Sequence, residues 1–168
     1  MRITDEYYFF WNGIYSQWYI NPNKLYLFKD VDEDGQIIKF ISAEHYMMYY
    51  KALTFNDIES AELILKTVHP GTVKAIGRAI KNYDDSVWSA KRFDVVVKGN
   101  LLKFSQNRNL LKDLSKYSNL EFVEASPYDK IWGIGLAEND DRVLDKSLWD
   151  GENLLGKAIN KVASILLK

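Results

Sequence analysis

The sequence predicts an α+β fold in which helices predominate and a small antiparallel sheet comes from the N-terminal third. Three observations carry this prediction. Short aromatic and β-branched runs fill the first forty positions, helical periodicity follows, and an amphipathic segment closes the chain. Strands followed by helices are typical of α+β proteins, whereas regular alternation would indicate a parallel sheet. At 168 residues, the chain is expected to form one domain over 1–168.

The predicted strands are bounded by turn-forming residues. They cover 7–10, 24–28 and 36–40, with two short later strands at 120–125 and 132–136. An acidic run from Asp30 to Gly35 matches the opening of a calcium-binding loop. The twelfth position is Ile41 instead of the bidentate glutamate, so an acidic hairpin turn is predicted there.

The predicted helices each have a polar residue at the N-cap position, or follow a polar loop. The expected caps are Ser42 for a helix ending near Leu53, Asp57 for the second, Thr72 for the third, and Asp84 or Asp85 for the fourth. Two further helices are predicted at 110–117 and 151–168.

The composition of the chain argues against several kinds of partner and cofactor. The net charge of −1 gives no electrostatic case for binding a nucleic-acid backbone. No stretch reaches the length that a membrane-spanning helix needs, so we expect a cytoplasmic protein without a membrane partner. There is no cysteine, and His45 and His69 lack metal-ligand spacing, so neither a metal nor a cofactor is expected.

The predicted helix at 42–53 is apolar nearly all round, yet it carries Glu44 and Lys51. Seven residues separate them, so they project from one face about 10 Å apart along the axis. Charged groups on a buried helix are costly unless they are paired or face a cleft. Two simpler explanations remain open: Glu44 suits the helix dipole, and Lys51 can extend its amine to the surface.

A second cluster is the segment EASPYDKIWGIGL. Glu124 and Asp129 flank a turn, Trp132 offers a flat face, and Gly133 and Gly135 allow close approach of the backbone. A tight turn between two core strands would explain the same residues. Elsewhere, Trp88 and Arg92 share a helical face, and Lys103 begins the run KFSQN.

Together these segments resemble the NADAR family, also called YbiA-like. The resemblance covers nearly the whole chain and rests on seven elements in order: FFWNGIYSQW, SAEHYMMYYKA, GRAI, Trp88-x3-Arg92, KFSQN, EASPYDKIWGIGL and WDGENLLGKAI. The chain departs from the family pattern at Ser16-Gln17-Trp18, where Ser-Asn-Phe is common. It departs again at Asn160-Lys161, where members often have an arginine.

The resemblance implies an N-glycosidase. Family members either hydrolyse unstable phosphorylated intermediates of riboflavin biosynthesis or remove ADP-ribose from guanine, including guanine in nucleic acid. The expected substrate is therefore a small ribosyl phosphate or an ADP-ribosylated guanine. A non-catalytic module that binds ADP-ribose or a nucleotide is the alternative. The residues indicate neither substrate over the other, nor an oligomeric state.

The resemblance also assigns roles to residues. Its motifs carry over onto Glu44, Lys51, Trp88, Lys103, Glu124, Asp129, Trp132 and Gly133. We expect Glu44, Lys51 and Asp129 to be catalytic, with Glu44 and Lys51 acting across a cleft from Asp129 and Trp132. The expected substrate-binding residues are Phe10, Trp88, Arg92, Lys103, Glu124, Trp132 and Gly133.

Overall fold

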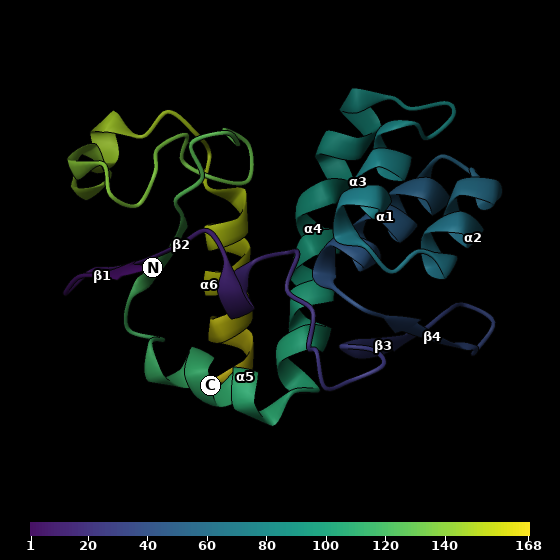
Figure 1. The fold of residues 1–168 in the computed structure, drawn as a ribbon, viewed down its shortest axis with the longest axis horizontal. Coiled ribbons are helices and arrows are strands. Elements are labelled where there is room, and N and C mark those ends of the chain that lie inside the picture. Colours follow the sequence, from purple (N-terminus) through teal and green to yellow (C-terminus); the bar gives the residue numbers. More distant parts are fainter. The chain divides into compact units, whose positions relative to one another are not determined.

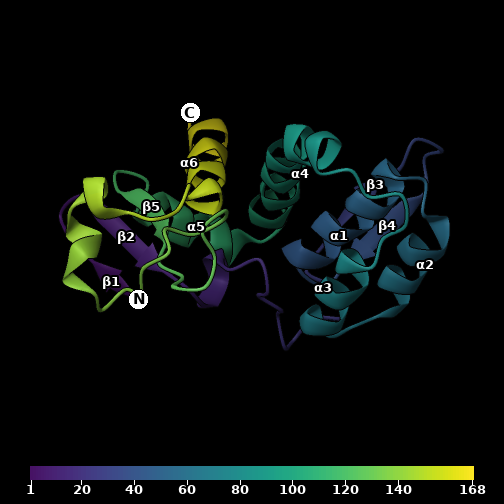
Figure 2. The ribbon, with the colours of Figure 1, turned by 90° about the horizontal axis from the view of Figure 1, so that it is seen from above.

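The computed structural model describes all 168 residues and divides them into two compact units (Figures 1 and 2). The terminal unit joins Met1–Ser16 to Arg108–Lys168, and the central unit is Gln17–Asn107. Six α-helices and two small sheets confirm the predicted helix-dominated α+β class. That both units form one domain stays a prediction.

The terminal unit is built on a three-stranded sheet in the order β1-β2-β5. Strand β2 pairs antiparallel with β1 and parallel with β5, and Tyr8 lies opposite Phe122. Helix α6 packs against β5. The elements are β1 (Arg2–Ile3), β2 (Tyr7–Phe10), α5 (Arg108–Lys116), β5 (Glu121–Glu124), α6 (Leu154–Leu166) and three short 3₁₀ turns, Gly13–Tyr15, Asp141–Leu144 and Lys146–Leu148. Its buried core includes Phe9, Val123, Ala125, Ile134, Leu136 and Val143.

The central unit is a helical cluster with an antiparallel hairpin. Helix α1 packs against α2, α3 and α4, which explains why its sequence is apolar nearly all round. The buried carboxylate of Asp30 on β3 accepts hydrogen bonds from Tyr46 (3.1 Å) and Tyr50 (2.9 Å) of α1. The elements are β3 (Phe28–Val31), β4 (Ile37–Phe40), α1 (Ala43–Thr54), α2 (Ile58–Lys66), α3 (Pro70–Arg78) and α4 (Asp85–Ser105).

Three of the predicted helix caps are confirmed. Ser42 accepts from the His45 backbone N–H, Asp57 accepts from that of Ser60, and Asp84 caps α4. The prediction of Thr72 was wrong, because α3 begins earlier. Pro70 fills its first turn, where a fixed φ suits the helix and the missing N–H costs nothing.

Two strand predictions need correction. The run 24–28 is extended only from Phe28 onward, and Leu25 is 96% exposed instead of packed. The segment 132–136 is not a strand. Gly135 has a φ of +71°, and the carbonyls of Trp132 and Gly133 accept from backbone N–H groups at the start of α6. Only β5 remains of the predicted later pair.

The acidic run forms the predicted hairpin turn. One Asp32 carboxylate oxygen accepts from the N–H groups of Asp34 (3.0 Å) and Gln36 (2.7 Å), and Gly35 supplies a φ of +79°. The side chain therefore closes the β3–β4 connection. None of the helices combines the length and apolar character that crossing a membrane requires.

Candidate active site

Glycines let neighbouring helices approach the buried helix α1. A Cβ at Gly77 of α3 would overlap the Met48 side chain, and one at Gly99 of α4 would come within 2.7 Å of the Tyr46 ring. The Glu44 side chain, on the first turn of the same helix, is only 3% exposed. Helix α1 therefore carries a buried acid among closely packed helices.

Lys51 is half-buried near the other end of α1, and its amine points inward. Its Nζ donates to the carbonyl oxygen of Gly77 at 2.7 Å. The same nitrogen lies 4.5 Å from the centre of the Tyr83 ring and 5.9 Å from that of Trp88. The amine of this half-buried residue thus has a backbone carbonyl and two aromatic rings as neighbours.

Charges around Lys51 tune its protonation. Burial lowers the pKa of the Lys51 amine, the Glu44 carboxylate opposes that shift, the positive charge of Arg78 adds to it, and Asp85 opposes it. The predicted face of α1 therefore holds an acid and an amine that interact electrostatically. A lysine with a lowered pKa has a larger neutral fraction at a given pH than an exposed one.

The other predicted site residues of the central unit lie at different points along helix α4. Trp88 is 5% exposed and lies beside Lys51, with half-buried Arg92 one turn further on. Lys103 lies fifteen residues beyond Trp88, about 22 Å along the axis, so the structure does not group it with Lys51. Burial lowers the pKa of Lys103 to about 7, and its Nζ lies 5.7 Å from the centre of the Tyr19 ring.

In the terminal unit, Asp129 organises the predicted loop. One of its carboxylate oxygens accepts from the N–H groups of Ile131 (2.9 Å) and Trp132 (2.8 Å). A Cβ at Gly133 would lie 2.9 Å from the carbonyl oxygens of both Glu124 and Asp129. The loop therefore needs glycine at this position, and it holds the half-buried Asp129 and Trp132 in one fixed turn.

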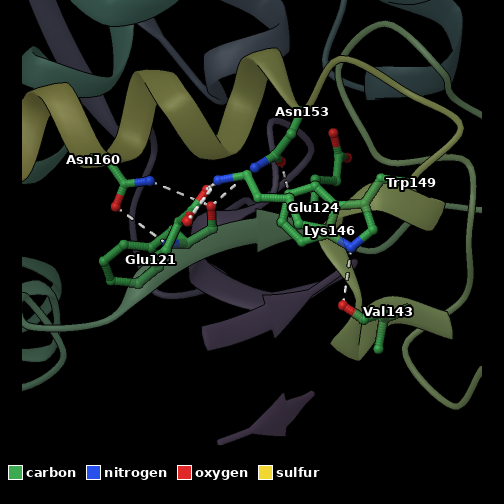
Figure 3. Close-up of polar contacts among 8 residues, drawn as sticks. Glu121, Glu124, Val143, Lys146, Trp149, Asn153 and Asn160 are labelled. Carbon is green, nitrogen blue, oxygen red and sulfur yellow. Dashed lines mark hydrogen bonds and ion pairs between the residues drawn. The ribbon is translucent and has the colours of Figure 1, made fainter. Parts of the chain in front are cut away.

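Helix α6 supports that loop through residues that sequence reasoning did not select. Asn153 accepts from the Glu124 N–H at 2.9 Å and donates to the Phe122 carbonyl at 3.2 Å (Figure 3). Asn160 accepts from the Phe122 N–H at 3.2 Å. The only sequence signal was the position of Asn153 within WDGENLLGKAI, because the partners are about thirty residues away in the chain.

Phe10 lies in the core, only 1% exposed, and packs on Tyr15 with ring centres 5.6 Å apart. It also lines a cavity of about 530 Å³ in the terminal unit. Trp11 on the same wall is 43% exposed and was not predicted as a site residue. No group of three or more histidine or acidic side chains is arranged to hold a metal ion.

Comparison with known proteins assigns the chain to a family. The model of the NADAR domain matches residues 8–167, which include parts of both units. The chain belongs to the NADAR family. Its fold resembles the NMR structure of the E. coli protein YbiA with a TM-score of 0.71 and 21% identity, over 99% of this chain and 88% of that one.

Two curated relatives show the same membership by sequence. The "N-glycosidase R617" of Acanthamoeba polyphaga mimivirus is 39% identical over 168 residues, covering 95% of both chains. "Protein irg-1" of Caenorhabditis elegans is 40% identical over 136 residues, covering 80% of this chain and 64% of that protein. Membership in the NADAR family and the viral relative support N-glycosidase activity in general terms.

Proposed function

We propose that this NADAR protein hydrolyses an N-glycosidic bond between a base or amine and a phosphorylated ribosyl group. The observation that carries the proposal is the enclosed amine of Lys51, which lies on the Gly77 carbonyl between two aromatic rings and interacts with the buried Glu44 carboxylate. A lysine whose pKa is lowered by burial, with a buried carboxylate interacting with it, is characteristic of catalytic sites.

Cleavage of an N-glycosidic bond is helped both by a carboxylate and by a proton donor. Breaking the C–N bond builds positive charge on the sugar, which a carboxylate such as Glu44 stabilises. The departing base takes the bonding electron pair, so a proton donor helps it to leave. Asp129 of the terminal unit is proposed as a second carboxylate of the reaction, and one of its oxygens is already engaged with the loop backbone.

Lys51 has three chemically distinct roles open to it: proton donor, contact to the ribose or phosphate, and nucleophile. As a nucleophile, its neutral amine forms a bond to the sugar C1 while the bond from C1 to the base breaks. The base leaves with the electron pair and a proton, and ring opening gives a Schiff base. One water then hydrolyses that intermediate, releasing the sugar and restoring the amine.

Two substrate classes fit the proposal. One is ADP-ribosylated guanine, and the other is a phosphorylated ribosylamine of the kind formed in riboflavin biosynthesis. A panel containing both classes, incubated with the protein and read by mass spectrometry, separates them by the product released. Sodium cyanoborohydride added during turnover reports the role of Lys51, because it reduces a Schiff base to a stable adduct on that residue.

The proposed site is tested by Glu44→Gln and Lys51→Ala. Each is expected to lower kcat/KM on the turned-over substrate at least about 100-fold, the range that acid–base or nucleophilic groups usually contribute. Circular dichroism and thermal melting check that each variant remains folded. Asp129→Asn is measured alongside, and a comparable loss is expected.

The matched controls are Glu62→Gln and Lys66→Ala. These two residues form an exposed ion pair on α2, so they repeat the same chemical changes away from the site. Both controls are expected to keep normal turnover. If Glu44→Gln and Lys51→Ala also kept near-normal turnover, the site would be wrong.

A module that binds ADP-ribose without cleaving it would need the same residues only as ligand contacts. Incubation with ADP-ribosylated guanosine monophosphate decides between the two. Release of free ADP-ribose indicates an enzyme, whereas stable retention of the intact nucleotide indicates a binding module and contradicts the proposal.

A further inference from the structure

Tyr83 is a neighbour of Lys51 that no family motif selected. It lies in the connection between α3 and α4, after Asn82, which adopts a left-handed φ of +58°. The centre of its ring is 4.5 Å from the Lys51 Nζ, closer than that of Trp88. Tyr83 is 45% exposed, so its ring forms the solvent side of the enclosure around the amine.

The position of the Tyr83 ring is itself fixed. Its hydroxyl donates to the Asp85 carboxylate at 2.8 Å, and the Phe55 ring packs on it with centres 5.3 Å apart. A ring held on two sides presents its face to Lys51 with little further loss of conformational freedom. The electron-rich face of an aromatic ring attracts a cation at such a distance.

We propose that Tyr83 is a positioning residue that holds the Lys51 ammonium on the Gly77 carbonyl and stabilises its charged form. The inference rests on the proposed role of Lys51 in the reaction, but it makes a claim about the amine that can be measured without substrate. The aromatic ring stabilises the ammonium, and the hydroxyl only anchors the ring through its hydrogen bond to Asp85.

Other charged groups near Lys51 also influence whether its amine is protonated. Glu44 on α1 and Asp85 on α4 favour the ammonium, while burial and Arg78 of α3 favour the neutral amine. The Tyr83 hydroxyl completes the set of titratable groups, and its own pKa is raised by partial burial and the hydrogen bond to Asp85. A ring that favours the charged form therefore limits how much neutral amine is present near neutral pH.

The test compares Tyr83→Leu with Tyr83→Phe. Competitive labelling of amines with acetic anhydride across a pH series, followed by peptide mass spectrometry, gives the pKa of Lys51 in each protein. Leucine keeps an apolar cover but removes the ring, so the pKa of Lys51 is expected to fall by about half a pH unit. Phenylalanine keeps the ring, so the pKa is expected to stay at the wild-type value.

The control is Tyr26→Leu, which removes a ring from a separate lysine–tyrosine pair in the same unit, with Lys39 at 5.2 Å. It should leave the pKa of Lys51 unchanged. If Tyr83→Leu proves unfolded by circular dichroism, Tyr83→Met replaces it as the aliphatic variant. In turnover, the limb of the kcat–pH profile that reports Lys51 is expected to shift with the pKa of Lys51, and phenylalanine is expected to restore it. This is the alkaline limb if the ammonium is the proton donor, and the acidic limb if the neutral amine is the nucleophile.

Two results would overturn the inference. One is an unchanged or raised pKa of Lys51 in the aliphatic variant, and the other is an equal fall in the phenylalanine variant, which would assign the effect to the hydroxyl. Failure of the proposed reaction is separable from both. If Lys51→Ala stayed active, the role of Lys51 would be wrong, while the labelling result would still decide what Tyr83 does.

Discussion

His45 lies next to Glu44 on α1, and its structural role depends on its being neutral. Its Nδ1 accepts from the Ile41 backbone N–H at 3.2 Å, and its Nε2 lies 2.6 Å from the Ile64 carbonyl oxygen. A carbonyl only accepts and an amide N–H only donates, so these partners require the proton on Nε2 alone. The imidazole thereby joins α1 to the end of β4 and to α2.

The titration of His45 is expected to make the protein less stable at mildly acidic pH. Burial lowers the pKa of His45, so between its folded and unfolded pKa values the unfolded chain binds more protons. The contribution of His45 to stability is therefore complete above pH of about 6.5 and is lost as the pH falls from there toward the folded pKa. The slope for one proton is at most about 1.4 kcal/mol per pH unit.

Urea denaturation of the wild type and His45→Asn at pH 7.5 and 5.5 measures this effect. Asparagine cannot titrate, so the variant is expected to be less stable overall but to lose less stability between the two pH values. Equal pH dependence in both proteins would show that His45 is not responsible.

At the scale of elements, β5 and α6 approach each other unusually closely. A Cβ at Gly156 of α6 would overlap the Phe122 carbonyl oxygen and the Asn153 side chain. Phe122 lies on β5, and Asn153 and Asn160 hold the polar groups of that strand. The glycine therefore sets how closely the helix can lie beside the strand that ends at Glu124.

Gly156→Ala is accordingly expected to lower the free energy of unfolding by about 1–3 kcal/mol, the usual cost of overpacking, because backbone must shift to admit the methyl group. The control is Lys157→Ala on the adjacent exposed position, which should change stability by less than about 0.5 kcal/mol. Thermal and urea denaturation measure both. A fully stable Gly156→Ala protein would contradict the predicted packing.

At the scale of the whole molecule, the net charge of −1 argues against extended contact with a nucleic-acid backbone. If ADP-ribosylated guanine is the substrate, recognition is expected to rest on the modified nucleotide itself. The value of kcat/KM should then differ by less than about threefold between a modified mononucleotide and a modified oligonucleotide. It should also change by less than about threefold between 50 and 200 mM salt. Six or more phosphate contacts would instead lower the affinity about 1,000-fold over that salt range. A steep loss with salt on the oligonucleotide alone would contradict this.

Much of the fold followed from local patterns. Side-chain caps at Ser42, Asp57 and Asp84 and the turn at Asp32 were predictable because each is made within a few residues of chain. The errors arose where distant segments compete for the backbone. The 132–136 segment has the composition of a strand, but its carbonyls bond to the start of α6.

Residue order and helical period were enough to predict the family, the α+β class and the spacing that places Glu44 and Lys51 on one face of α1. The surroundings of the Lys51 amine could not be predicted in this way, because they come from distant parts of the chain. The Gly77 carbonyl and the Tyr83 ring lie 26 and 32 residues further along the chain, and the approach of α3 to α1 brings the Gly77 carbonyl to it. A backbone carbonyl has no sequence signature, so this partner is set by helix packing alone.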